Sequence, residues 1–322
     1  MGRQDLKYRA SVKVVVADGD SLICQGLRNA LTDEGYQDIR TVGRLLAVRE
    51  IMATSMVDLL VLDVDLPDGD GVALVRDIRH GRIGRNPFLP IIFVTWEADT
   101  EIIRRAVSSG VDLILLKPAS ASQLFSRIDQ LVVDRKPFVV SADYVGPDRR
   151  DKPGRAENTQ FYQVPNTLKD KIEGRKINAT ELSGQIASTV KEMNSRRLEE
   201  AAIQLNANID SVCRAFEARD RYDDIEYGLS QASYAAKEIA NLGSIDIVKL
   251  CASLMGVIDA IRVDLKQVPT KQIELLWPMA QSILMACKAE ASSNPVMEEI
   301  SKTLSSFNAG KMPATANHDG GI

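Results

Sequence analysis

The chain has 322 residues, with 40 lysines and arginines, 44 aspartates and glutamates, and a net charge of −4. This length predicts about two domains, and the charge balance argues against bulk attraction to nucleic acid or to an anionic membrane. There are only two histidines, His80 and His318, so any histidine-based relay, metal site or catalytic triad must use one of them.

Targeting signals are missing from the sequence as written. The first residues are polar, and no apolar run approaches the roughly 20 residues that a membrane helix needs. The four cysteines lack C-x-x-C spacing, which is typical of buried thiols in a reducing compartment. We therefore expect a cytoplasmic protein without a membrane partner.

The first 134 residues alternate short apolar runs with amphipathic stretches. Runs buried on both faces of a parallel sheet are continuous and rich in β-branched residues, and five such strands are predicted at residues 12–17, 39–42, 59–62, 91–94 and 113–116. Helical patterns cover residues 22–34, 45–55, 72–80, 100–109 and 122–133. This order predicts an α/β fold with a doubly wound five-stranded parallel sheet, in a domain spanning residues 11–134.

Residues 135–165 differ in composition from the parts on either side. Proline and glycine recur there, in Gly146-Pro147 and Lys152-Pro153-Gly154 for example, which indicates a linker. The net charge of this stretch is +2, whereas residues 1–134 and 166–322 each carry −3. The basic stretch either remains solvated or docks on an acidic surface.

From residue 166 to residue 310 the pattern is helical throughout, and residues 311–322 read as a disordered tail. Apolar side chains step at three to four residues from Leu182 to Phe216. A second helix should end near Leu242-Gly243, a third follows, Pro269-Thr270 opens a fourth, and Asn294-Pro295 opens a fifth. We expect an all-α bundle.

Four polar side chains follow or end the predicted strands. They are Asp18, Asp63, Thr95 and Lys117, and parallel strands bring their carboxyl ends to one edge of the sheet. Clustered carboxylates need a cation, and Mg²⁺ prefers oxygen ligands. A lysine beside them can neutralise a further anion. The set predicts a site that places phosphate on a carboxylate.

These residues carry a resemblance to a known family. Residues 11–134 resemble the CheY-like receiver domain of bacterial two-component response regulators, and the stretch DLLVLDVDLPDGDG from Asp58 to Gly71 is similar to that family's phosphoacceptor segment. The resemblance implies that Asp63 accepts phosphate from a sensor histidine kinase or a phosphotransfer protein. It also implies that Thr95 is the switch hydroxyl, that Lys117 contacts the phosphate, and that Pro118 follows a cis peptide bond.

The metal site implied by the resemblance is incomplete. It would use Asp18, Asp63 and the backbone carbonyl of Asp65 to hold Mg²⁺, but Gly19 stands where the family has a second acid, and Asp20 lies one position further on. Ile114 replaces the family's aromatic switch residue. The leading hypothesis is a phosphorylated, non-enzymatic response regulator, and the alternative is a pseudo-receiver scaffold that works without phosphorylation.

The segment KPFVVSADYVGPDRR, from Lys136 to Arg150, resembles a tail that follows some alphaproteobacterial receivers. Tyr144 and the pair Arg149-Arg150 could fold back on the receiver or contact a partner.

A hydrolase is the remote alternative. Gly19-Asp20-Ser21-Leu22 spells the signature of GDSL hydrolases, and Asp77 to His80 spells their D-x-x-H. A serine nucleophile needs its histidine within hydrogen-bond reach. His80 ends a helix that begins near Gly71, so it should lie about 13 Å from the strand ends.

The helical half weakly resembles a histidine phosphotransfer bundle. Lys237 stands where the histidine would be, and residues 166–310 contain no histidine, so a relay function is excluded there. A binding-only bundle or an unrelated one remains open, as does a homodimer. The net charge of −3 argues against DNA output. We expect signalling through protein contacts with an output partner that the sequence does not name.

Overall fold

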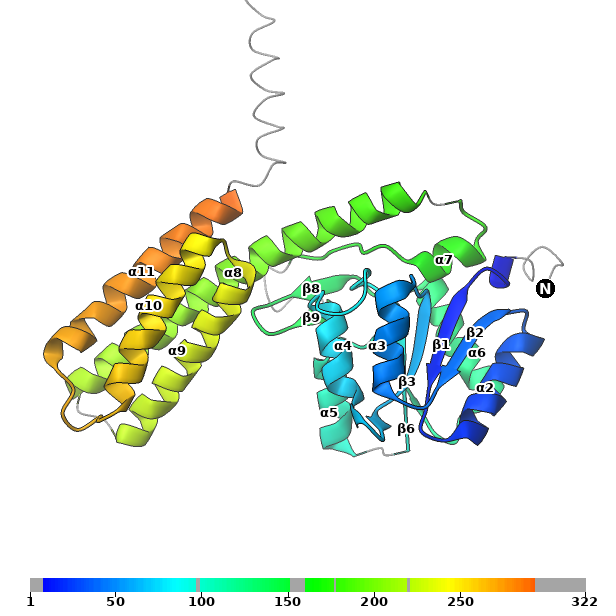
Figure 1. Cartoon of the computed structure of the whole chain (residues 1–322), viewed down its shortest axis with the longest axis horizontal. Coiled ribbons are helices and arrows are strands. Elements are labelled where there is room, and N and C mark those ends of the chain that lie inside the picture. Colours follow the sequence, from blue (N-terminus) through cyan, green and yellow to red (C-terminus); the bar gives the residue numbers. More distant parts are fainter. Residues whose placement is uncertain (1–7, 97–98, 151–159, 177, 219–220, 293–322) are drawn as a thin grey trace, which may run out of the picture. The chain divides into compact units, whose positions relative to one another are not determined.

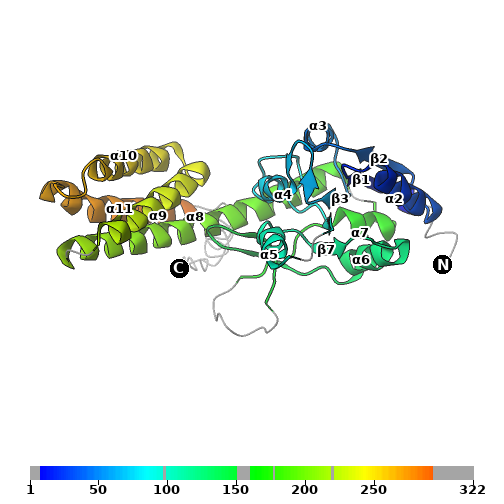
Figure 2. The same ribbon diagram turned by 90° about the horizontal axis from the view of Figure 1, so that it is seen from below.

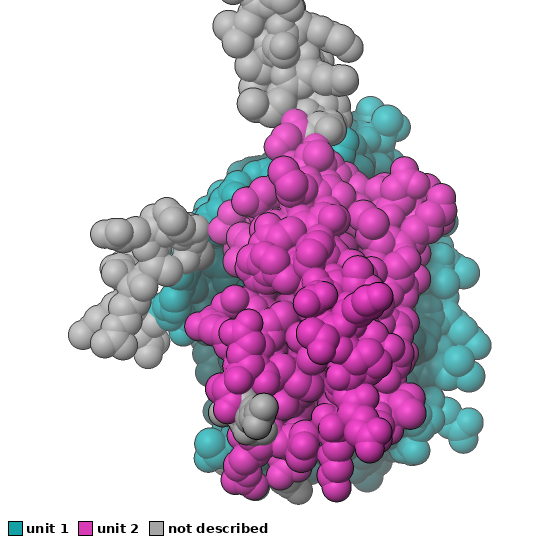
Figure 3. All heavy atoms as spheres, turned by 90° about the vertical axis from the view of Figure 1, so that its left-hand side faces the viewer, with its two compact units in different colours: residues 1–193 teal, residues 194–322 magenta. Residues whose placement is uncertain are grey.

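The computed structural model describes residues 8–96, 99–150, 160–176, 178–218 and 221–292. The chain divides into two compact units, residues 1–193 and residues 194–322, which Figure 3 colours teal and magenta. Each unit has a core of its own and is described by itself. No helix in the described part of the chain is both long enough and apolar enough to cross a membrane.

The first unit is built on a five-stranded parallel sheet (Figure 1). Its strands are β1 (Lys13–Ala17), β2 (Asp38–Val42), β3 (Leu59–Asp63), β6 (Ile91–Thr95) and β7 (Leu113–Leu116). They lie in the order β2-β1-β3-β6-β7. Between their ends the central strands β1, β3 and β6 are apolar and buried, because helices cover both faces of the sheet. The predicted fold class is thereby confirmed.

Two hydrophobic cores fill the space between the sheet and its helices. On one face pack α3 (Leu45–Thr54), α4 (Gly71–Arg79) and α5 (Thr100–Ser108). On the other face pack α2 (Ser21–Asp33) and α6 (Ala121–Val133). Alternate residues of each strand enter opposite cores, as Val15 and Val16 of β1 do. The helices begin within one residue of their predicted starts.

Side-chain caps explain where these helices begin. The carboxylates of Asp20, Asp70 and Asp99 accept hydrogen bonds from the second residue of α2, α4 and α5. Ser120 and Gln123 form a capping box at the start of α6. Between β3 and α4 lies a small hairpin of β4 (Asp65–Leu66) and β5 (Gly69–Asp70).

The stretch expected as a linker contains a second hairpin, β8 (Phe138–Val140) and β9 (Val145–Pro147). Its apolar residues are the physical reason, because Phe138 is fully buried and Val145 nearly so. Phe138 also exchanges backbone hydrogen bonds with Tyr162. Residues 151–159 of the same stretch lie outside the described residues.

Two helices complete the first unit. The short helix α7 (Thr167–Ile172) packs beside α6 (Figure 2) and places Leu168 in the core below α2 and α6. The long helix α8 (Ala179–Ala218) begins in this unit, where Leu182, Ile186 and Met193 pack in a third core with Phe138.

The second unit is an all-α region. It holds the rest of α8 together with α9 (Tyr222–Leu242), α10 (Ile245–Arg262) and α11 (Thr270–Ser292). Buried residues recur at helical spacing in each, such as Leu205, Leu229, Leu254 and Ile283. The predicted helix starts and stops therefore agree with the structure through residue 292. The expected fifth helix and the tail lie outside the described residues.

Candidate functional site at the strand ends

The carboxyl ends of β1, β3 and β7 bring together two carboxylates and an ammonium group. Asp18 follows β1, Asp63 ends β3, and Lys117 follows β7. Lys117 Nζ lies 2.6 Å from Asp18 Oδ2 and 2.8 Å from Asp63 Oδ2. The side chain of Lys117 is 3% exposed, that of Asp18 4% and that of Asp63 13%, so this ion triad is nearly closed to solvent.

Burial and ion pairing set the charges in the triad. Burial raises the pKa of Asp63, and the nearby Asp18 raises it further, against the opposing effect of Lys117. Burial alone would lower the pKa of Lys117, but its bonds to Asp18 and Asp63 outweigh burial and raise it. Lys117 therefore favours its protonated, charged form, whereas burial disfavours the ionised form of Asp63.

Thr95 and Pro118 adjoin the triad through the backbone. Thr95 ends β6 beside β7, is 4% exposed, and its carbonyl accepts the amide hydrogen of Lys117 at 2.7 Å. The Lys117–Pro118 peptide bond is cis. Trp96, which follows Thr95 in the chain, is 62% exposed, and its ring centroid lies 5.5 Å from Lys117 Nζ. This cation–π contact was not predicted from the sequence, and it places a fluorescent side chain at the site.

The loop after Asp63 folds tightly because of its glycine and its acids. A Cβ on Gly71 would come within 2.7 Å of the Asp63 carbonyl oxygen, so only glycine lets α4 start this close to β3. Asp68 accepts the amide hydrogens of Leu45 and Leu46 at the start of α3. Asp68 and Asp70, two acids of the segment from Asp58 to Gly71, thus bind the amide groups at helix starts.

The residues predicted to bind metal are only partly brought together. Asp18 and Asp63 meet at Lys117, but the Asp20 side chain accepts the Leu22 amide hydrogen as the cap of α2. Asp65 is exposed, and its amide donates to Asp63 Oδ1 at 3.4 Å. In the described ranges no three histidine, cysteine, aspartate or glutamate side chains gather closely enough to hold a metal ion. The donor set falls one carboxylate short at Gly19, and these residues do not fit a tightly held Mg²⁺.

Part of the chain matches a known protein family. Residues 14–129 match the response regulator receiver domain family. The N-terminal part of the chain is a receiver domain. The match covers little more than a third of the chain, and the remaining residues lie outside it.

Curated relatives match a little over a third of this chain. The chain is 34% identical over 120 residues to the transcriptional regulatory protein GltR of Pseudomonas aeruginosa, covering 37% of this chain and 48% of that protein. It is 29% identical over 120 residues to PdtaR of Mycobacterium tuberculosis, covering 56% of that protein. The chain thus spans about half the length of these relatives. The chemotaxis protein CheY-3 of Vibrio cholerae is 26% identical over 121 residues and is covered to 92%.

Among solved structures, a CheY-like receiver from Methanospirillum hungatei is 24% identical, with a TM-score of 0.34, and is matched over 93% of its length and 37% of this chain. Receiver domains generally bind Mg²⁺ at the phosphorylation site, interact with histidine kinases or phosphotransfer proteins, and are typically non-enzymatic signalling regulators.

The residues of the hydrolase alternative lie at opposite ends of the receiver domain. Ser21 opens α2 beside the carboxyl end of β1, whereas His80 follows the last residue of α4, which starts at that same end of the sheet.

Ile114, at the aromatic switch position, is half-buried and packs against the core on the α3–α5 face.

A buried cluster of Asp112 with Arg79, Arg135 and Arg149, here called the Asp112 hub, was not predicted from the sequence. It binds the segment after the receiver domain to the end of the sheet opposite the triad. Asp112 Oδ2 lies 2.8 Å from Arg79 Nη2, and Asp112 Oδ1 lies 2.7 Å from Arg135 Nε. Arg149 donates to the carbonyls of Val111 and Asp112. The segment KPFVVSADYVGPDRR therefore folds back on the receiver domain here. In the sequence, only Tyr144 and the pair Arg149-Arg150 indicated that this segment could fold back.

Proposed function

We propose that this chain is a response regulator of a two-component phosphorelay, with Asp63 as its phosphoacceptor. The observation that carries the proposal is the triad, in which the Lys117 ammonium binds both Asp18 and Asp63 at the strand ends. The family-typical positions of Thr95 and Pro118 support it.

The proposed chemistry is a transfer between a phosphohistidine of the partner and a carboxylate. An Asp63 oxygen attacks phosphorus, the bond from phosphorus to the imidazole nitrogen breaks, and the electron pair returns to the imidazole. The product is an acyl phosphate on Asp63. Lys117, already 2.8 Å from Asp63 Oδ2, supplies positive charge for the phosphoryl oxygens, and Thr95 offers a hydroxyl from the neighbouring strand.

Binding of Mg²⁺ is proposed to be weak. Asp18, Asp63 and the Asp65 carbonyl are the family-typical ligands, but Gly19 leaves the set short. The proposed transfer of phosphate to Asp63 does not depend on the metal.

Intact-mass measurement after incubation with acetyl phosphate tests the proposal. We expect the wild-type chain to gain one phosphoryl group and the Asp63→Asn chain to gain none. Glu50→Gln is the control, since it removes an exposed carboxylate of α3 that has no part in the site and should leave the gain unchanged. Equal gain by wild type and Asp63→Asn would refute Asp63 as the acceptor.

The rival function is a phosphorylation-independent scaffold, and Gly19 is the observation that favours it. If wild type gains no phosphoryl group with or without Mg²⁺, the scaffold is the better description. The triad would then be a structural ion cluster whose lysine neutralises two buried acids.

We further propose that the helical region passes the signal on through protein contacts. On α9 the exposed side chains of Tyr227, Ser230, Tyr234 and Lys237 recur at helical spacing and share one face. Large aromatic side chains and a cation are typical of contact surfaces. Substituting Tyr227 and Lys237 by alanine should weaken capture of the output partner without lowering phosphorylation of Asp63.

A further inference from the structure

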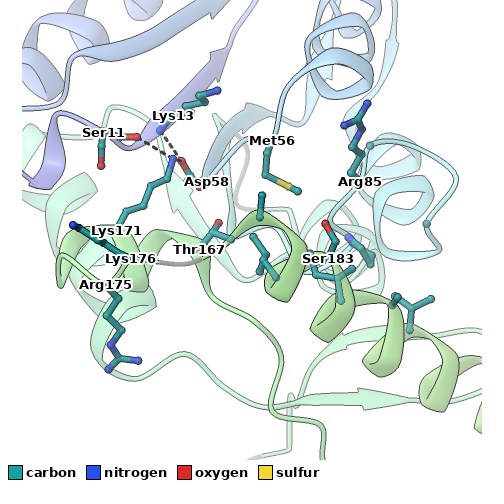
Figure 4. A pocket seen from close by; sticks show the side chains of 18 residues that line it. Ser11, Lys13, Met56, Asp58, Arg85, Thr167, Lys171, Arg175, Lys176 and Ser183 are labelled. Atoms are coloured by element: carbon teal, nitrogen blue, oxygen red, sulfur yellow. Dashed lines mark hydrogen bonds and ion pairs between the residues drawn. The ribbon is translucent and has the colours of Figure 1, made fainter.

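The receiver unit contains a second concave site, at the opposite end of the sheet from Asp63. This cavity has a volume of about 930 Å³, within the range of small-molecule sites. Its wall includes Lys13 at the start of β1 and Asp58 directly before β3. The other side is formed by α7 and the first three turns of α8 (Figure 4).

The cavity is strongly basic. Five cationic side chains line it against one acid, Asp58. That acid is already neutralised, because Lys171 Nζ lies 2.6 Å from Asp58 Oδ2, and the Lys13 amide donates to the same oxygen at 2.8 Å. Three of the cationic side chains, those of Lys13, Arg85 and Lys176, make no ion pair with any residue that the structure describes.

A buried hydroxyl also lines the cavity. Thr167 is 2% exposed, and its Oγ1 has no hydrogen-bond partner among the described residues. Figure 4 shows the Thr167 side chain between Lys171 and Ser183, pointing into the cavity. A buried hydroxyl without a partner is costly, and a hydrogen bond from Thr167 to a ligand oxygen would remove that cost.

The part of the wall that α8 forms is apolar. Leu182, Ile186 and Val190 lie four residues apart on one face of α8 and line the cavity. The first turn of the same 40-residue helix also lines it, through Ala179 and Leu182. The positive end of the helix dipole thus adds to the charge of the lysines and arginines.

We propose that this cavity binds a small organic phosphate, with its phosphoryl group at Thr167 and the cations and its apolar body against α8. A phosphate monoester carries close to two negative charges. Three unpaired cations match that charge better than they match a single carboxylate. The site is separate from the phosphoacceptor and would let a metabolite influence the receiver independently of phosphorylation.

Titration calorimetry on the full chain tests this proposal with naphthyl phosphate as the probe. We expect one site per chain, with tighter binding than either naphthol or inorganic phosphate shows, because only the probe fills both halves of the cavity. Binding should be unchanged in Asp63→Asn, which separates this site from the phosphoacceptor. Absence of saturable binding, or loss of binding in Asp63→Asn, would overturn the proposal.

Variants then locate the site. Thr167→Val should weaken probe binding roughly tenfold, the effect of losing one hydrogen bond to a charged group, while Thr167→Ser should keep the wild-type affinity. The pair Arg85→Gln with Lys176→Gln should weaken binding further. The matched pair Lys191→Gln with Lys237→Gln makes the same charge change on exposed residues outside the cavity and should not. Equal affinity in all these variants would place the probe elsewhere.

Discussion

At the scale of single residues, Gly19 decides how well the receiver domain holds a metal. Its backbone is not in the left-handed region, and an added Cβ would meet only Pro67, with Cδ at 3.3 Å. An aspartate therefore fits with a small shift of the proline ring. It would place a third carboxylate beside Asp18 and Asp63.

We predict that Gly19→Asp tightens Mg²⁺ binding by about tenfold or more, the scale at which single groups around a metal change its affinity. Trp96 reports the binding, because its ring lies 5.5 Å from Lys117 Nζ. The chain has two tryptophans, so Trp277→Phe makes the signal specific. Gly19→Ala is the control, since it fills the same space without a carboxylate. If Gly19→Ala binds Mg²⁺ as tightly as Gly19→Asp, the missing carboxylate is not the limiting feature.

Asp63 makes the stability of the receiver domain depend on pH. Because burial raises its folded pKa, the folded state binds a proton more readily than the unfolded state does. The charged form therefore costs stability above the folded pKa, and this cost disappears as the pH falls through that value.

We therefore predict that Asp63→Asn has a higher free energy of unfolding than wild type at neutral pH, and that the difference shrinks on acidification. Urea denaturation of both chains at a series of pH values measures it, and the subtraction cancels the other carboxylates. A difference that grows as the pH falls would mean that the attraction of Lys117 outweighs the burial of Asp63.

At the scale of elements, the hairpin β8–β9 is held to the receiver domain by the Asp112 hub. The guanidinium groups of Arg79 and Arg135 both contact the Phe138 ring, with their central carbons 5.2 and 5.1 Å from its centroid. Gly110 and Gly146 meet where the hairpin crosses the chain, and a Cβ on Gly146 would come within 2.6 Å of Gly110 Cα. The motif Val145-Gly146-Pro147 is thus explained by close backbone packing.

Asp112→Asn should destabilise the receiver domain by roughly 3–5 kcal/mol, because removing one partner leaves a buried charge uncompensated. Arg79 is that charge. Its side chain is 0% exposed, and burial lowers its pKa only to about 10, so it stays protonated at neutral pH. Urea denaturation measures the loss. The control Asp77→Asn removes a more exposed partner of Arg49 and Arg82 and should cost about 1 kcal/mol or less. Equal losses would show that the hub is not structural.

The sequence predicted the five strands of the parallel sheet, the helices that cover it and the residues of the triad, because each follows from local pattern or from strand ends. Apolar runs and the positions of Asp63 and Lys117 are readable within short windows. The hub was not readable, since Arg79, Asp112 and Arg149 come from separate windows and meet only after folding. The basic cavity was missed for the same reason. Its cations lie far apart along the chain, and α8 closes it through long-range packing.

At the scale of the whole molecule, the two compact units have separate cores. The core residues Val61 and Phe93 pack only with others of the first unit. Ile258 lies fully buried in the helical unit, where α10 packs against α9 and α11. Separate cores favour separate cooperative transitions.

Scanning calorimetry of the full chain should therefore show two transitions. Phe93→Ala should lower the temperature of only one transition, and Ile258→Ala only that of the other. Each substitution should reduce the free energy of unfolding of its own unit by about 2–5 kcal/mol, as large-to-small core changes do. Naphthyl phosphate should raise the temperature of only the transition that Phe93→Ala shifts, since all of the cavity lining belongs to the first unit. If both substitutions lowered a single shared transition, α8, which belongs in part to each unit, would couple them into one cooperative whole.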